Sequence, residues 1–332
     1  MKKLIAVTMI VMAAVGAFAV PVVTDVVAKQ RYPWNGLVDI TCKVTGIEGT
    51  TNGLEFAMAV VMPDTGNASP ASHFWVVQGG TNSTDLAVHS NGDYRLLWDA
   101  RTDLGQVKYT NMVVRITAVK SRDKVQLWEG GPYWATTNIG AEEPWDYGYY
   151  FWWGDTVGYR RENAAWGASD GSTSNFSFSD SNTPTHNKII EHLQNEGWIT
   201  SDNVLTPAHD AAYVQWGGSW RMPTYSELLD LDYNCDWTWT TTNGVNGYVV
   251  RGRGDYVSSS IFLPAAGYGG GTSLNCAGSY GYYWSSVTDS GNYYAIGLDF
   301  GLDFGSVYRY HSPGSGYRTE GRSVRPVQGF TE

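Results

Sequence analysis

The sequence predicts a mostly β protein with an N-terminal β-sandwich followed by an α+β domain. The chain has 332 residues, which is more than one ordinary domain core accommodates. Only 16% of its residues are charged, whereas it contains 39 Gly, 22 Tyr and 15 Trp, the reverse of a helical-bundle composition. From about residue 22 to residue 119, apolar and polar residues alternate as they do in half-buried strands.

The first 19 residues are typical of a secretory signal peptide. Lys2 and Lys3 precede an apolar run at 4–15, and Ala17 and Ala19 supply the small residues that a signal peptidase recognises. The run is shorter than the roughly 20 residues that a membrane span requires. We therefore expect cleavage near Ala19 and a protein without a membrane span that is secreted, periplasmic or at the cell surface.

Charge and cysteine content narrow the function classes. The chain has 22 Lys and Arg against 32 Asp and Glu, a net charge of −10, which argues against nucleic acid as a partner. Cys42, Cys235 and Cys276 are odd in number and lack C-x-x-C spacing, so we expect no metal site and no cofactor. Export would permit a disulfide between Cys235 and Cys276, and small buried thiols are the alternative.

Residues 20–122 form the predicted sandwich. Short alternating segments are separated by turn clusters, and no helical pattern interrupts them. A charged segment at 120–124 marks the predicted boundary, so the second domain covers residues 123–332. The alternating sets are Val38, Ile40, Cys42 and Val44; Leu54, Phe56, Met58 and Val60; Tyr94, Leu96 and Trp98; and Met112, Val114, Ile116 and Ala118.

The second domain combines a few short helices with strands. Thr224 and Glu227 have the spacing of a capping box at the start of a helix. Thr206 before Pro207 predicts a second helix start, and a third helix is expected over 187–195. The run at 261–267 is apolar throughout and is expected to be buried. This mixture predicts an α+β domain.

Several ordered strings in the second domain carry a family resemblance. Over residues 125–328 the chain resembles the Fibrobacter-type major paralogous (FISUMP) domain. That resemblance implies a C-type-lectin-like fold, shared with formylglycine-generating, sulfatase-modifying enzymes. Some relatives are variable proteins of diversity-generating retroelements, whose C-terminal strands and loops form a mutable binding face. The strings are Trp134-Ala135-Thr136, Asn138-Ile139-Gly140-Ala141, Tyr150-Phe151-Trp152-Trp153-Gly154, Gly217-Gly218-Ser219-Trp220-Arg221-Met222-Pro223-Thr224, Tyr283-Trp284-Ser285-Ser286 and Ser323-Val324-Arg325-Pro326-Val327.

The first domain carries a weaker resemblance. Leu97-Trp98-Asp99-Ala100 with Asp103, together with Leu37-Val38-Asp39-Ile40, is similar to the immunoglobulin-like module that precedes sulfatase-modifying-type domains in some secreted bacterial proteins. This implies a sandwich that serves as a spacer, with no chemistry of its own.

The residues do not favour catalysis. Enzymes of the related fold oxidise cysteine with a C-terminal cysteine pair and copper, and neither Cys235 nor Cys276 lies in that segment. No G-x-S-x-G elbow is present. His186, Glu191 and His192 do not share one helix face, so they do not form a metal cluster. We therefore expect no enzyme.

The aromatic run at 147–153 could stack on carbohydrate, although packing is the stronger interpretation.

The segment 291–318 is the expected binding face. Leu298 and Phe300 alternate with Asp299, so one strand face is apolar and the other is expected to be presented outward. Tyr, Ser and Gly follow, the residues that adaptable paratopes use. Residues 287–319 contain no Lys, Glu, Gln, Met or Trp, as adenine-directed diversification requires, but neither do residues 240–283, so diversification stays open. The expected ligand-binding residues are Tyr294, Asp299, Asp303, Tyr308, Tyr310, His311 and Tyr317.

The sequence thus predicts a secreted, non-catalytic protein that binds a protein or glycan ligand on a cell or phage surface. The alternatives are a sulfatase-modifying-type oxidoreductase or its degenerate relative, and a structural protein of the bacterial envelope.

Overall fold

The computed structural model describes residues 21–32, 35–47, 54–61, 68–71, 73–78, 80–83, 85–104, 113–120, 122–302 and 309–329. These residues form two compact units, divided between Arg122 and Asp123. Most of their elements are strands, with only a few short helices, so the mostly β fold class is confirmed. The expected signal peptide at 1–19, Met112, Asp303 and Tyr308 lie outside the described residues.

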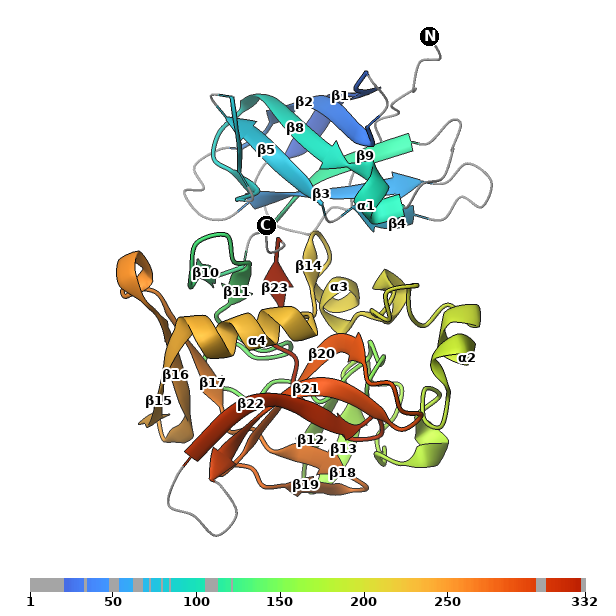
Figure 1. The fold of residues 1–332 in the computed structure, drawn as a ribbon, viewed down its shortest axis with the longest axis vertical. Helices are drawn as coiled ribbons and strands as arrows, with labels where there is room; N and C mark the ends of the chain where they lie inside the picture. Colours follow the sequence, from blue (N-terminus) through green and yellow to red (C-terminus); the bar gives the residue numbers. More distant parts are fainter. Residues whose placement is uncertain are drawn as a thin grey trace. The chain divides into compact units, whose positions relative to one another are not determined.

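The first unit contains two antiparallel sheets that share one core (Figure 1). One sheet has the order β1 (Val22–Gln30), β2 (Leu37–Thr45), β8 (Gly92–Asp99), β5 (Phe74–Gln78) and β6 (Thr81–Ser83). In the other, β3 (Leu54–Val61) pairs with β4 (Ala68–Ala71), β7 (Ala87–Val88) and β9 (Val113–Lys120). The predicted alternating residues that are buried in this core are Val38, Ile40, Cys42, Val44, Phe56, Met58, Val60, Leu96, Trp98, Val114 and Ile116.

A short helix, α1 (Ala100–Leu104), closes the end of β8. Its Asp103 accepts a hydrogen bond from Nε1 of the buried Trp98 at 2.8 Å and lies 2.7 Å from Nδ1 of His73. The Asp103 side chain therefore connects this helix to Trp98 of β8 and to His73, which precedes β5.

The second unit contains five sheets and three α-helices among the residues that the structure describes. The helices are α2 (Ile190–Asn195), α3 (Ala211–Trp216) and α4 (Tyr225–Asn234), with 3₁₀ turns η1 (Asp180–Asn182), η2 (Pro207–His209) and η3 (Gly254–Tyr256). The sheets are β10 (Lys124–Gln126), β11 (Tyr133–Ala135), β23 (Val327–Gln328) and β14 (Trp220–Arg221); β12 (Tyr159–Glu162) and β13 (Ala165–Ala168); β15 (Cys235–Thr242), β16 (Val245–Gly252) and β17 (Ser260–Pro264); β18 (Tyr268–Gly270) and β19 (Ser273–Asn275); and β20 (Gly281–Thr288), β21 (Tyr294–Leu302) and β22 (Arg309–Tyr317).

The helix starts agree with the sequence in one case and differ in another. At α4 both bonds of the predicted capping box between Thr224 and Glu227 are present. Before α3, the predicted start at Thr206 and Pro207 is that of the 3₁₀ turn η2 and not of an α-helix: Thr206 is the N-cap residue of this turn, but it makes no side-chain cap bond. The buried Asp210 caps α3 instead, and its second oxygen accepts from the amide of Met222 at 2.9 Å. The Asp210 side chain thus accepts hydrogen bonds from backbone amides of two separate segments.

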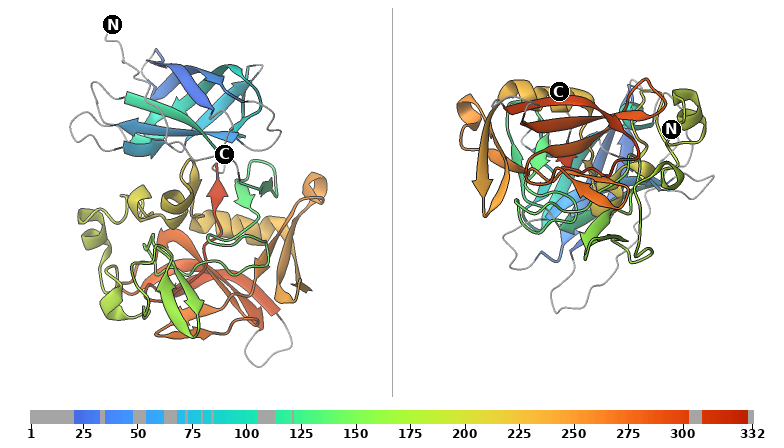
Figure 2. Two further views of the ribbon diagram at one scale, coloured as in Figure 1. Left: turned by 180° about the vertical axis from the view of Figure 1, so that it is seen from behind. Right: turned by 90° about the horizontal axis from the view of Figure 1, so that it is seen from below.

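The sheet β20–β21–β22 is packed on both sides. Leu298 and Phe300 lie in one cluster with Leu231 of α4, and α4 contacts all three strands. On the other side, Trp284 and Ala295 belong to a second buried cluster. Figures 1 and 2 show α4 on one side of this sheet and the β12–β13 hairpin on the opposite side.

Most of the C-terminal segment 318–329 is buried, and residues 321–329 are buried without interruption. Its residues bridge to Phe151 through Arg322 and to Tyr283 through Ser323. The apolar run at 261–267 is buried as predicted. Four aromatic residues of the run at 147–153 are buried as well, which confirms packing as the role of Tyr150, Phe151, Trp152 and Trp153.

Candidate ligand-binding face

The hairpin of β21 and β22 divides the predicted binding residues into two groups. Tyr294 lies directly opposite Tyr317 at one end, and at the other end Phe300 faces His311 and Gly301 faces Tyr310. Six or seven residues of extended strand separate the two groups, which is roughly 20 Å. The structure therefore brings Tyr294 and Tyr317 together, and it locates Tyr310 and His311 by backbone position only.

Tyr294 and Tyr317 form what we call the tyrosine pair. Their ring centroids are 4.7 Å apart with an interplanar angle of 37°. Tyr317 is 49% exposed, and hydrogen bonding to it raises the pKa of Tyr294, which keeps that phenol neutral. Two amphipathic rings in contact offer broad contact area at little entropic cost.

Tyr293, the next residue along the chain, is a further exposed aromatic residue that the sequence reasoning did not select. It is 40% exposed, and its ring centroid lies 5.0 Å from that of His186. His186 is in turn 3.4 Å from Asp180. The position of Tyr293 directly before β21 was the only sequence signal for it, and being next to Tyr294 gave no reason to select it.

The buried Arg318 holds the backbone around the tyrosine pair. Its side chain is fully buried, and its guanidinium lies 5.3 Å from the Trp153 ring. Nε donates to the carbonyl of Tyr294 at 3.0 Å. The other donors reach the carbonyls of Thr185, Lys188, Asn292 and Gly291 and the hydroxyl of Thr288, at 2.5–3.0 Å.

This arginine stays charged despite its burial. Burial lowers the pKa of Arg318 to about 10, and Asp289 opposes that effect. The group is therefore protonated at neutral pH, and its charge is met by backbone and hydroxyl dipoles rather than by a bonded carboxylate. A planar, fully bonded fork fixes several chain segments at once. The tyrosine pair consequently stands on a preorganised frame.

Asp299 does not have the outward position that the sequence suggested. Its Oδ1 accepts from Nη1 of Arg322 at 2.6 Å, and Arg322 is itself buried. Nε and Nη2 of Arg322 donate to Glu320, and the guanidinium lies 4.5 Å from the Trp284 ring. Burial lowers the pKa of Arg322, but the two carboxylates outweigh it and raise the pKa overall. Asp299 thus has a partner inside the unit.

Glycines of the hairpin make room for this arginine. A Cβ on Gly316 would lie 1.9 Å from Nη2 of Arg322, and one on Gly297 would lie 3.0 Å from Nη1. The glycines on this strand face, which suggested an open display, are instead the surface against which Arg322 packs. A glycine-rich strand can be exposed or can admit a large neighbour, and the alternation alone does not distinguish the two cases.

The cysteines differ in their surroundings. All three are free; Cys42 and Cys235 are buried, and Cys276 is exposed. Burial raises the pKa of Cys235 to about 12, so its thiol is neutral and unreactive at ordinary pH. Among the described residues there is no group of three His, Cys, Asp or Glu side chains that could hold a metal ion.

The part of the chain that the structure describes contains no helix long and apolar enough to cross a membrane. Comparisons of the chain with protein-family models, with curated proteins and with solved structures found no match.

Proposed function

We propose that the chain is a secreted, non-catalytic binding protein that holds a protein or glycan ligand of a cell or phage surface. The second unit would be the C-type-lectin-like scaffold that the sequence resemblance implies. The first unit would be an immunoglobulin-like β-sandwich that acts as a spacer. The contact between Tyr294 and Tyr317, held in place by the buried Arg318, is the observation that carries this proposal.

Preorganisation of the backbone around the tyrosine pair favours binding. Binding is weakened when loops and long side chains must be ordered on contact, and a site whose frame is already rigid avoids that loss. Arg318 connects the backbone at 185–188 with that at 291–294, next to the tyrosine pair. Exposed tyrosines on such a frame are typical of the aromatic anchors of interfaces.

The proposed site is smaller than the one expected from sequence. Asp299 is bonded to Arg322, so it supports the sheet rather than contacting ligand. Tyr310 and His311 belong to the far end of β22, and Asp303 and Tyr308 remain predictions. The tyrosine pair, with Tyr293 beside it, is therefore the part of the face that the proposal uses.

The cysteine environment favours binding over the oxidoreductase alternative. Cysteine oxidation requires accessible thiols that can ionise. Cys235 is buried with its pKa raised to about 12, whereas Cys276 is exposed in a separate strand connection. Because Cys235 is buried and its pKa is raised, it is not the readily ionised thiol that such chemistry needs.

The test uses two ligand-independent screens of the full secreted chain. The wild-type protein is applied to an array of bacterial glycans, and peptides are selected against it from a phage-displayed library. The site variant is Tyr294→Ala with Tyr317→Ala. The matched control is Tyr225→Ala with Tyr233→Ala, two tyrosines of α4 that are 40% and 69% exposed.

The proposal expects binders in at least one screen, with affinity reduced at least tenfold in the site variant and unchanged in the control. Both variants should keep the wild-type melting temperature within a few degrees, because Tyr225, Tyr233 and Tyr317 are exposed and Tyr294 is only half-buried. Binders that ignore the site variant, or the absence of binders in both screens, would overturn the proposal.

A further inference from the structure

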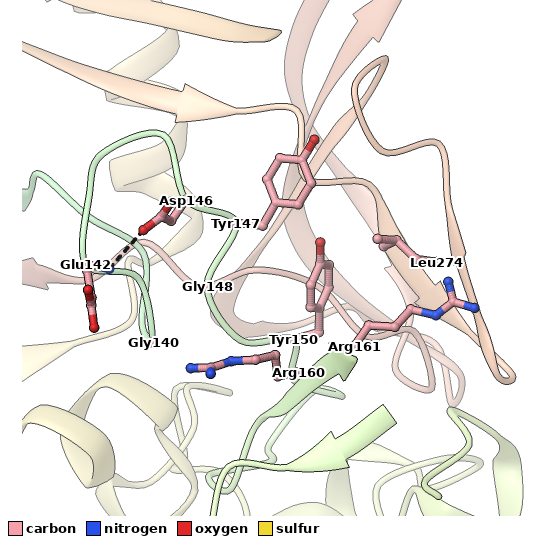
Figure 3. A pocket seen from close by; sticks show the side chains of 9 residues that line it. All are labelled: Gly140, Glu142, Asp146, Tyr147, Gly148, Tyr150, Arg160, Arg161 and Leu274. Atoms are coloured by element: carbon pink, nitrogen blue, oxygen red, sulfur yellow. Dashed lines mark hydrogen bonds between the residues drawn. The ribbon is translucent and has the colours of Figure 1, made fainter. Parts of the chain in front are cut away.

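A cavity of about 360 Å³ lies in the second unit between the turn at 140–148 and the β12–β13 hairpin (Figure 3). It shares no residue with the tyrosine pair. Its volume is within the range of small-ligand sites. Aromatic, aliphatic, cationic and acidic side chains all contribute to its lining, and the residues that matter most are Tyr147, Tyr150, Arg161, Leu274, Asp146 and Glu142.

Arg161 supplies a cationic group that has no ion-pair partner in the described part of the chain. Among the described residues no carboxylate bonds to it; its Nη2 reaches only the carbonyl of Ala164, at 3.4 Å. Its Nε is buried without a hydrogen-bond partner, and the guanidinium lies 5.8 Å from the Trp166 ring. A partly desolvated arginine with unused donors is suited to a carboxylate.

The backbone holds this arginine at the cavity. It lies in β12, whose hairpin with β13 turns through Asn163 and Ala164, both with positive φ (49° and 64°). A two-residue turn of this kind fixes the register of the strands. Figure 3 shows Arg161 directed toward Leu274, while Arg160 runs the other way, toward Gly140.

Two tyrosines and a leucine provide the apolar wall. Tyr150 is buried, and its hydroxyl donates to the carbonyl of Ala266 at 2.6 Å, so its ring is fixed. Tyr147 is partly buried, and burial raises its pKa. Leu274 of β19 is half-buried beside Arg161 (Figure 3). Flat apolar rings of this kind pack against the C–H face of a sugar.

The other end of the cavity is lined by the carboxylates of Asp146 and Glu142, so we call it the acidic end, and Arg160 runs toward it (Figure 3). One oxygen of Asp146 accepts from the backbone amides of Glu142 and Glu143 at 3.3 and 3.1 Å, which fixes the carboxylate. Its second oxygen is available as an acceptor for ligand hydroxyl groups. Gly148 turns the backbone here with a positive φ of 74°, where a Cβ would lie 2.3 Å from the carbonyl of Ile139. At Gly148 the cavity is therefore lined by backbone alone.

We propose that this cavity binds a uronic acid unit of an acidic glycan. The sugar carboxylate pairs with Arg161, its ring packs on Tyr147 and Leu274, and its hydroxyl groups donate to Asp146 at the opposite end. A neutral sugar would leave the arginine without a partner. A small aliphatic carboxylate would use neither the aromatic wall nor the acidic end.

The test is isothermal titration of the full chain with galacturonate, glucuronate and mannuronate trimers. The methyl-esterified galacturonate trimer is the matched ligand, because esterification removes the charge and keeps the ring. Arg161→Met is the site variant, and Arg253→Met is the control, since Arg253 is exposed and pairs with Asp236 elsewhere. Thermal unfolding checks that each variant folds.

The inference expects at least one acidic trimer to bind, with the dissociation constant raised at least tenfold by esterification and by Arg161→Met, but not by Arg253→Met. Tyr147→Leu provides a second variant that removes the flat ring, keeps an apolar side chain and should weaken binding of the same trimer. Equal binding of the esterified trimer, binding unaffected by Arg161→Met, or no binding of any acidic trimer would overturn it.

Discussion

Replacing Arg318 by Met removes the group that organises the tyrosine pair. The guanidinium has five N–H donors, and in the structure they reach five carbonyl oxygens and one hydroxyl. The side chain is fully buried, so water does not replace these bonds unless the segment opens. Met fills part of the volume but leaves the acceptors without donors.

The size of the effect follows from these contacts. A buried acceptor left without a donor costs about 1–3 kcal/mol, and removing a desolvated cation offsets part of the total. We expect Arg318→Met to lower the free energy of unfolding by about 3–5 kcal/mol. For a unit of this size that corresponds to a fall in melting temperature of roughly 10 °C.

The measurement is urea unfolding followed by tryptophan fluorescence. Arg253→Met is the matched control: its guanidinium is also hydrogen-bonded, to one carboxylate and two carbonyls at 2.6–2.8 Å, where Arg318 has carbonyls and a hydroxyl, but the Arg253 side chain is 54% exposed. Because water can replace those bonds, the control should lose less than about 1 kcal/mol. A loss below about 1 kcal/mol for Arg318→Met, or equal losses in both variants, would refute the reasoning.

Three further predictions concern packing, capping and pH. Gly316→Ala should lower the free energy of unfolding by about 2 kcal/mol or more, because its Cβ would lie 1.9 Å from the hydrogen-bonded Arg322. The control Gly314→Ala, whose Cβ would have no neighbour nearer than 3.6 Å, should lower it by less than about 1 kcal/mol. Equal urea midpoints for the two variants would contradict this. Thr224→Ala should cost about 1 kcal/mol, since its hydroxyl caps α4, and an unchanged unfolding free energy would show that the cap contributes nothing. Burial raises the pKa of Asp210 from 3.8 to about 6, so the folded state binds its proton more tightly and this group's contribution to stability is lost as pH rises from about 4 through 6. The stability of the wild type relative to Asp210→Asn should therefore fall by up to about 3 kcal/mol between pH 4 and pH 7, and parallel pH curves would argue against the shift.

Much of the fold could be predicted because a strand that buries one face shows alternating apolar and polar residues in the sequence. Ile40 and Phe56 alternate with polar or less buried neighbours, and both lie in the core of the first unit. The capping box at Thr224 is equally local, since its two bonds join residues three apart. The cap of α3 was not predictable in this way, because the Asp210 side chain also accepts a second hydrogen bond, from the amide of Met222, which follows strand β14.

The candidate site could be predicted only in part. Tyrosines interspersed with Ser and Gly indicated an interaction surface, but the pairing of Tyr294 with Tyr317 depends on hairpin register, and a one-residue slip would move either ring to the opposite face. The direction of Asp299 depended on Arg322, which is 23 positions further along the chain. The three buried arginines 318, 322 and 325 lie within eight positions of a glycine- and aromatic-rich segment. That clustering was the only sequence signal that they are buried.

Ligand footprinting of tyrosines shows whether the tyrosine pair contacts a bound ligand. The strongest binder from the two screens is added to the full chain, and oxidation of each exposed tyrosine is measured by mass spectrometry with and without it. The account predicts protection of Tyr317, with Tyr294 following it, and no change at the 69% exposed Tyr233 on α4. Protection of Tyr233 with full reactivity at Tyr317 would contradict the claim that the tyrosine pair binds the ligand.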